Sequence, residues 1–193
     1  MELIPAILPK DQSDLIQKLA ALPRDAKSVH IDFVNPPLTP SFIKEGAKGV
    51  DFLEAHLMVA DPLVCIPDLV KNGFSRVLIH AEAVSAEVFA ETIHEWRDAI
   101  EIGAALKIET PLDALSSFVH ELQTIQLMGI AHLGRQGEPF DERVIGRVLQ
   151  LHHTYPNHII SVDGGVNKEN AKRLTAAGAK RLVVGSAIKE FYG

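Results

Sequence analysis

Short runs rich in Val, Ile and Leu recur along the 193-residue chain at nearly constant intervals. Each run is short enough for a β-strand and too continuously apolar for a strand with one face in water, so the pattern predicts a parallel sheet covered by helices. The eight runs are Leu3–Leu8, Val29–Val34, Phe52–Val59, Arg76–Glu82, Ile102–Ile108, Ile125–Ile130, Ile159–Asp163 and Arg181–Gly185.

Helical patterns with recognisable ends lie between the runs. Asp61-Pro62 predicts an N-cap and first-turn proline, and Asn72-Gly73 predicts the end of that helix. Asn167 predicts the start of a helix that stops at Gly178. Thr110-Pro111 predicts another helix, whose apolar positions at helical spacing are Leu112, Leu115, Val119 and Leu122.

The region from Asn35 to Gly49 has the weakest helical pattern. Its three prolines leave room for only a short helix after Ser41. Even so, eight strand–helix units without a linker predict one closed (β/α)8 TIM barrel of the α/β class, a single domain over residues 1–193. The alternative, a doubly wound sheet, is disfavoured because no Gly-rich dinucleotide fingerprint follows the first run.

Charge and composition narrow the possible partners. The net charge is −6 and the pI is about 5.8, so the chain lacks the clustered basic charge that holds nucleic acid. No segment has the ~20 uninterrupted apolar residues of a membrane span, and the first residues do not resemble a secretory signal. The single cysteine, Cys65, suits a reducing compartment. We therefore expect a soluble cytoplasmic protein that binds neither membranes nor nucleic acid.

Polar residues interrupt the apolar runs near their C-terminal ends, where parallel barrels carry their chemistry. Side chains two apart share a face of a strand. The pairs of this kind are His30 with Asp32, His56 with Met58, His80 with Glu82, and Lys107 with Glu109, and Asp163 ends the seventh run. Such groups must pair, bind metal or face a wet cavity, because burying one of them alone costs several kcal/mol.

Four of these residues form a candidate metal site: His30, Asp32, His56 and Asp163. Neutral imidazole and carboxylate suit one divalent cation such as Zn²⁺, Mn²⁺, Fe²⁺ or Co²⁺. The alternative for either histidine alone is a hydrogen-bonded core residue. Two histidines and two aspartates at one barrel mouth favour the metal site.

At these motifs the sequence resembles the ribulose-phosphate 3-epimerase family almost from end to end. The resemblance rests on a His-x-Asp strand, a His-Leu-Met strand, a fourth strand with His-x-Glu and an Asp-Gly-Gly turn. These motifs, together with the opening strand and the last glycine-rich turn, lie at Pro5–Leu8, Val29–Asp32, Ala55–Val59, Ile79–Glu82, Val162–Val166 and Val184–Ala187.

The resemblance implies a barrel that binds one divalent cation through His30, Asp32, His56 and Asp163. It implies that Asp32 and Asp163 act as the acid and base on opposite faces of a phosphorylated ketose. The default pair is D-ribulose 5-phosphate and D-xylulose 5-phosphate, interconverted at C3 through an enediolate. Met58 and Met128 match methionines that line the family's site, with core packing as the alternative.

Other features concern the phosphate. Gly164-Gly165 and Gly185-Ser186 match the family's phosphate-binding turns, although structural turns are the alternative. Ala6 replaces a serine of the family, and Phe33–Pro37 departs from its usual sequence. The family's Gly-rich sixth loop reads Ala131–Glu138 here, where Arg135 is either a phosphate ligand or a solvated residue.

Two further functions remain open at this stage. Lys107 stands where the family has an asparagine. Three roles are open for it: balancing nearby charge, contacting the substrate, or serving as the Schiff-base lysine of an aldolase. The other possibility is a non-catalytic sugar-phosphate-binding barrel. A homo-oligomer is also possible, because the family often forms dimers or larger assemblies.

Overall fold

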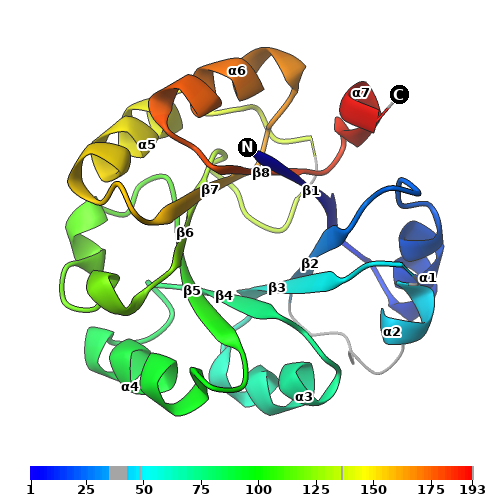
Figure 1. The fold of residues 1–193 in the computed structure, drawn as a ribbon, viewed down its shortest axis with the longest axis horizontal. Helices are drawn as coiled ribbons and strands as arrows, with labels where there is room; N and C mark the ends of the chain where they lie inside the picture. Colours follow the sequence, from blue (N-terminus) through cyan, green and yellow to red (C-terminus); the bar gives the residue numbers. More distant parts are fainter. Residues whose placement is uncertain (35–42, 48, 136, 193) are drawn as a thin grey trace.

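The computed structural model describes residues 1–34, 43–47, 49–135 and 137–192. Within them, eight parallel strands close into a barrel in chain order, with β8 paired to β1 (Figure 1). This confirms the predicted (β/α)8 barrel. The strands are β1 (Glu2–Ile7), β2 (Ser28–Val34), β3 (Phe52–Met58), β4 (Arg76–His80), β5 (Glu101–Leu106), β6 (Thr124–Met128), β7 (Ile159–Asp163) and β8 (Arg181–Val184).

Helices surround this barrel on its outside (Figure 1). As predicted, Asn167 is the N-cap of α6 and forms a capping box with Asn170, and Gly178 is its C-cap with φ +111°. The α-helices are α1 (Gln12–Ala20), α2 (Ile43–Gly46), α3 (Ile66–Lys71), α4 (Ala86–Trp96), α5 (Arg143–Thr154), α6 (Lys168–Ala177) and α7 (Ile188–Tyr192). The short α2 agrees with the helix expected after Ser41, while residues 35–42 lie outside the described chain.

Two predicted helices differ in detail. The one expected at Asp61-Pro62 begins with a 3₁₀ turn, η2 (Leu63–Cys65), whose N-cap is Pro62 with no side-chain cap. The segment after Thr110-Pro111 forms two 3₁₀ turns, η3 (Leu112–Leu115) and η4 (Val119–Glu121), instead of an α-helix. Ser116 lies between them, and its hydroxyl donates to the Asp113 carbonyl at 2.5 Å. Such side-chain bonds compete with the helical ladder.

The strands separate an apolar layer from a polar interior. Outward-facing residues such as Ile31, Leu57 and Ile79 are fully buried in the hydrophobic layer beneath the helices. Inside the barrel, by contrast, polar side chains are buried, among them His30, Glu54, His56, Arg76, Gln126 and Ser161. No helix of the described residues is long and apolar enough to span a bilayer.

Candidate metal centre

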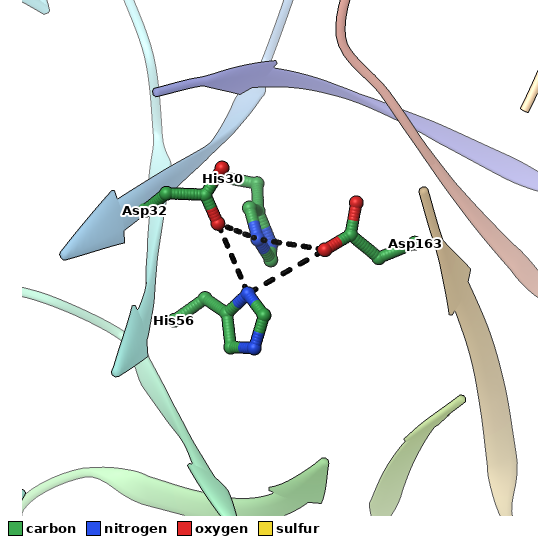
Figure 2. Close-up of side chains that lie close together, drawn as sticks. All are labelled: His30, Asp32, His56 and Asp163. Carbon is green, nitrogen blue, oxygen red and sulfur yellow. Dashed lines mark hydrogen bonds and ion pairs between the residues drawn. The ribbon is translucent and has the colours of Figure 1, made fainter. Parts of the chain in front are cut away.

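Four side chains converge at the C-terminal end of the barrel (Figure 2). Asp32 of β2 lies in register with His56 of β3, which puts these neighbours side by side. His30 lies two residues before Asp32 and shares its face, and Asp163 is the last residue of β7. The structure thus brings the whole predicted ligand set together.

The spacing of the donor atoms fits one cation. His30 Nε2 lies 3.3 Å from Asp32 Oδ1 and 3.8 Å from Asp163 Oδ2, and His56 Nδ1 lies 3.0 Å and 3.4 Å from the same two atoms. A tetrahedral site with metal–ligand bonds of 2.0–2.1 Å has edges of about 3.3 Å. The donor atoms of the four residues all lie within 4.8 Å of one another, so small shifts of these side chains would suit them to one small divalent cation.

The electrostatics of the site also favour a cation. Burial lowers the pKa of His30, but hydrogen bonds to Asp32 and Glu54 outweigh it and raise that pKa well above the usual value. Burial opposes the charge of His56 in the same way, yet Asp163 and Asp32 raise its pKa. Both imidazoles are fully buried, whereas the side chains of Asp32 and Asp163 are 13% and 12% exposed. Two carboxylates beside buried rings favour a bound positive charge.

Glu54, a buried carboxylate that the sequence analysis did not single out, bonds His30 from the barrel interior. Glu54 Oε1 accepts a hydrogen bond from His30 Nδ1 at 2.6 Å, and Glu54 Oε2 accepts one from Arg76 at 2.5 Å. Burial would raise the pKa of Glu54, but His30 and Arg76 lower it to about 2. The sequence could have indicated Glu54 by its position, because it lies two residues before His56 and so faces the same interior.

His56 has a partner on its other side. Its Nε2 lies 2.9 Å from Nε2 of His80, whose Nδ1 lies 3.2 Å from Glu82. Burial, with the nearby His56 and Lys107, lowers the pKa of His80 despite its hydrogen bond to Glu82, which favours the neutral ring. Glu82 in turn accepts hydrogen bonds from the Lys107 amide and the Thr110 hydroxyl.

A pocket opens above the cluster, at the mouth of the barrel. Asp32 and Asp163 reach its wall, and Ala6 lines it as well. The pocket also gathers every residue predicted to contact substrate or phosphate: Met58, Met128, Arg135, Gly164, Gly165, Gly185 and Ser186. Gly165 has φ +66°, and a Cβ there would come within 2.8 Å of the Phe140 backbone, so this turn requires glycine.

Lys107 lies apart from the cluster. Its side chain is exposed beyond the end of β5, and among the described residues its amine has no hydrogen bond or ion pair. Glu82 pairs with the Lys107 backbone instead, and Glu109 pairs with Arg143 at 2.7 Å. Among the described residues the Lys107 amine therefore forms no ion pair with Glu82 or Glu109, but its charge helps lower the pKa of His80.

The fold and the cluster together define a (β/α)8-barrel protein with a candidate mononuclear centre of two histidines and two aspartates. The sequence model described as the ribulose-phosphate 3 epimerase family matches residues 2–189, and the chain belongs to this family.

Individual relatives are similar to the chain at modest identity. It is 30% identical over 194 aligned positions to the ribulose-phosphate 3-epimerase of Chlamydia trachomatis, covering 89% of this chain and 82% of that protein. The Bacillus subtilis protein of the same name is 28% identical, with 97% and 92% covered. The chloroplast protein of Arabidopsis thaliana is 29% identical over 83% of this chain, which spans only 61% of that protein's length.

Solved structures share the fold alone. The 3-hexulose-6-phosphate synthase of Salmonella typhimurium superposes with a TM-score of 0.67 at 16% identity, covering 98% of this chain and 91% of the other. Phosphoribosyl anthranilate isomerase of Thermus thermophilus gives 0.64 at 16% identity, with 97% and 88% covered.

Proposed function

We propose that this protein is a metal-dependent isomerase that inverts C3 of a phosphorylated ketose, with D-ribulose 5-phosphate and D-xylulose 5-phosphate as its pair. One observation carries this proposal: Asp32 and Asp163 come from well-separated strands, β2 and β7, and reach the same pocket. Membership of the family and the names of the relatives support the same reaction.

The two carboxyl groups supply the proton chemistry. Inverting a carbon next to a carbonyl requires a base on one face and an acid on the other. Hydrogen bonds from His30 and His56 outweigh burial and lower the pKa of Asp32, so this carboxylate starts ionised and takes the C3 proton of one epimer. Asp163 then delivers a proton to the opposite face, and the roles exchange in the reverse direction.

His30, Asp32, His56 and Asp163 would hold the cation. When bound, a divalent cation would coordinate the substrate oxygens and stabilise the negative charge that develops between the two proton transfers. Zn²⁺, Mn²⁺, Fe²⁺ and Co²⁺ all suit this donor set. Glu54 keeps the His30 ring in place from the interior, since it bonds the nitrogen that faces away from the cluster.

The pocket offers separate places for the two ends of the substrate. Backbone amides of the Gly164-Gly165 and Gly185-Ser186 turns would bind the phosphate, with Arg135 as its charged partner. Met58 and Met128 would provide an apolar wall beside the reacting carbon. Ala6 leaves that side of the pocket without a hydroxyl donor.

A Schiff-base aldolase gains no support from the structure, because such a lysine needs a desolvated setting and Lys107 is exposed. The cytoplasm remains the compartment we propose, because the single thiol, Cys65, is free.

The decisive experiment uses ribulose 5-phosphate in deuterated water with metal-loaded and chelator-stripped protein. We expect the loaded protein to form xylulose 5-phosphate with solvent deuterium at C3, and the stripped protein to lose this activity until metal is restored. Tight binding of the sugar phosphate without deuterium incorporation would contradict the proposal and select the non-catalytic barrel. Full activity after rigorous stripping would contradict the metal requirement.

A further inference from the structure

Both imidazoles of the cluster are hydrogen-bonded on the ring nitrogen that faces away from it. His30 uses Nδ1 for Glu54 at 2.6 Å and keeps Nε2 toward the two aspartates. His56 shows the opposite arrangement, with Nε2 toward His80 at 2.9 Å and Nδ1 toward the aspartates. The two rings therefore offer different nitrogens to the same point in space.

The direction of each hydrogen bond on the His56 side follows from the chemistry of its partners. An ionised carboxylate only accepts, so the Glu82 contact requires that His80 Nδ1 donates. A neutral ring that donates from Nδ1 has its lone pair on Nε2. His56 Nε2, 2.9 Å away, must then be the donor. In the structure His56 Nδ1 faces Asp32 and Asp163, which accept its proton. When a cation displaces that proton, His56 still carries its other proton on Nε2, so the Nδ1 lone pair is free to bind the metal.

Glu82 itself is fixed by donors from a different element. The backbone amide of Lys107 donates to its Oε1 at 2.9 Å, and the Thr110 hydroxyl donates to the same oxygen. Its other oxygen, Oε2, faces His80. The loop after β5 therefore sets the orientation of a carboxylate that contacts none of the four cluster residues.

We infer that Glu82, acting through His80, is a positioning residue. It keeps the His56 proton on Nε2, so that Nδ1 is free to bind the metal. Glu54 plays the corresponding part for His30 by direct contact. The inference rests on the proposed metal centre and adds two residues, His80 and Glu82, that lie outside the four ligands. Such outer partners typically contribute about 10- to 100-fold to metal affinity.

Glu82→Gln is the sharpest test, because the structure predicts that it reverses the chain of donors. The Lys107 amide would hold the glutamine oxygen, so the NH₂ group would face His80 Nδ1 and donate to it. His80 would then carry its proton on Nε2, which points at the Nε2 proton of His56 and forces one of the two rings to change its tautomer. Glu109→Gln is the matched control, since it removes an exposed carboxylate at the same end of the barrel, where Glu109 pairs with Arg143.

A second pair of variants tests the same chain at His80. In His80→Gln, the amide oxygen can accept from His56 while the NH₂ group donates to Glu82, which preserves the order of donors. His80→Leu has a similar size and preserves neither bond. His158→Leu controls for losing a half-buried imidazole elsewhere, because His158 bonds the Val119 carbonyl at the opposite end of β7.

The readouts are the Zn²⁺ dissociation constant, measured by competition with a chromophoric chelator, and long-range ¹H–¹⁵N spectra of the Zn²⁺-loaded protein. We expect zinc on His56 Nδ1, an affinity loss of about 10- to 100-fold in Glu82→Gln and His80→Leu, and less than threefold change in His80→Gln and both controls. Equal affinities for Glu82→Gln and Glu109→Gln, or zinc on His56 Nε2, would overturn the inference while leaving the metal centre intact. A wild-type protein that binds no zinc would instead refute the proposed centre itself.

Discussion

Arg76 and Glu54 form an ion pair inside the barrel, directly beneath the candidate metal centre. Their NH1 and Oε2 atoms lie 2.5 Å apart, and the two side chains are 4% and 0% exposed. Arg76 also reaches Glu101 at 2.9 Å, while Glu54 bonds His30. The floor of the metal site is therefore a charged network, and losing one member leaves the others buried without compensation.

Arg76→Met should destabilise the protein strongly. The substitution keeps an unbranched side chain but leaves the Glu54 carboxylate buried without its arginine partner, so the free energy of unfolding should fall by about 3–5 kcal/mol. Urea denaturation followed by circular dichroism measures this quantity. Arg173→Met is the matched control, because the Arg173–Glu142 pair is exposed and should contribute little. Equal losses in the two variants would show that the buried network does not stabilise the fold.

Asp32→Asn should abolish turnover. The amide cannot act as a base, so we expect kcat to fall by about 10²- to 10⁴-fold. Metal content must be measured alongside, since Asp32 is also a candidate ligand and loss of the cation would lower kcat by a second route. Asp51→Asn, at a carboxylate 77% exposed, provides the control. Wild-type turnover by Asp32→Asn would remove Asp32 from the acid–base pair.

Arg135→Met should weaken substrate binding while leaving metal affinity unchanged. Losing one charge-assisted hydrogen bond to phosphate corresponds to a rise in KM of about tenfold. Arg97→Met removes an exposed arginine from the end of α4 and serves as the comparison. If KM stays the same in both variants, Arg135 is a solvated loop residue, which was the alternative for this position.

Two glycines should respond to alanine in opposite directions. Gly178 has φ +111°, and a Cβ there would lie 2.3 Å from the His152 ring, so Gly178→Ala should lower stability by about 1–3 kcal/mol. Gly146 lies within α5 with open space around it, and Gly146→Ala should raise stability by about 0.5–1 kcal/mol. Thermal unfolding of both variants checks the signs, and a shift in the same direction for both would contradict this account.

Part of the candidate site could be predicted because repeated strand–helix units give a barrel whose strand ends meet at one rim. Polar residues two apart at the ends of successive apolar runs must face one interior, and this alone places His30, Asp32 and His56 together. The prediction of an α-helix after Thr110-Pro111 was wrong, because hydrophobic periodicity does not show where side-chain hydrogen bonds compete with those of the helix backbone. There the Ser116 side chain bonds a backbone carbonyl within the segment.

The sequence by itself determined the number of strand–helix units, the closed barrel and the four residues that could ligate a cation, because hydrophobic period and side-chain alternation are local properties. Only the tertiary structure decided which nitrogen of each histidine faces the aspartates, and that Glu54 and His80 lie against the other nitrogens. Those contacts, and the ones that hold Glu54 and Glu82 in turn, join strands and loops that lie 22 to 28 residues apart, and they depend on the registers between strands. Register arises from the packing of the whole barrel, so no stretch of sequence encodes it alone.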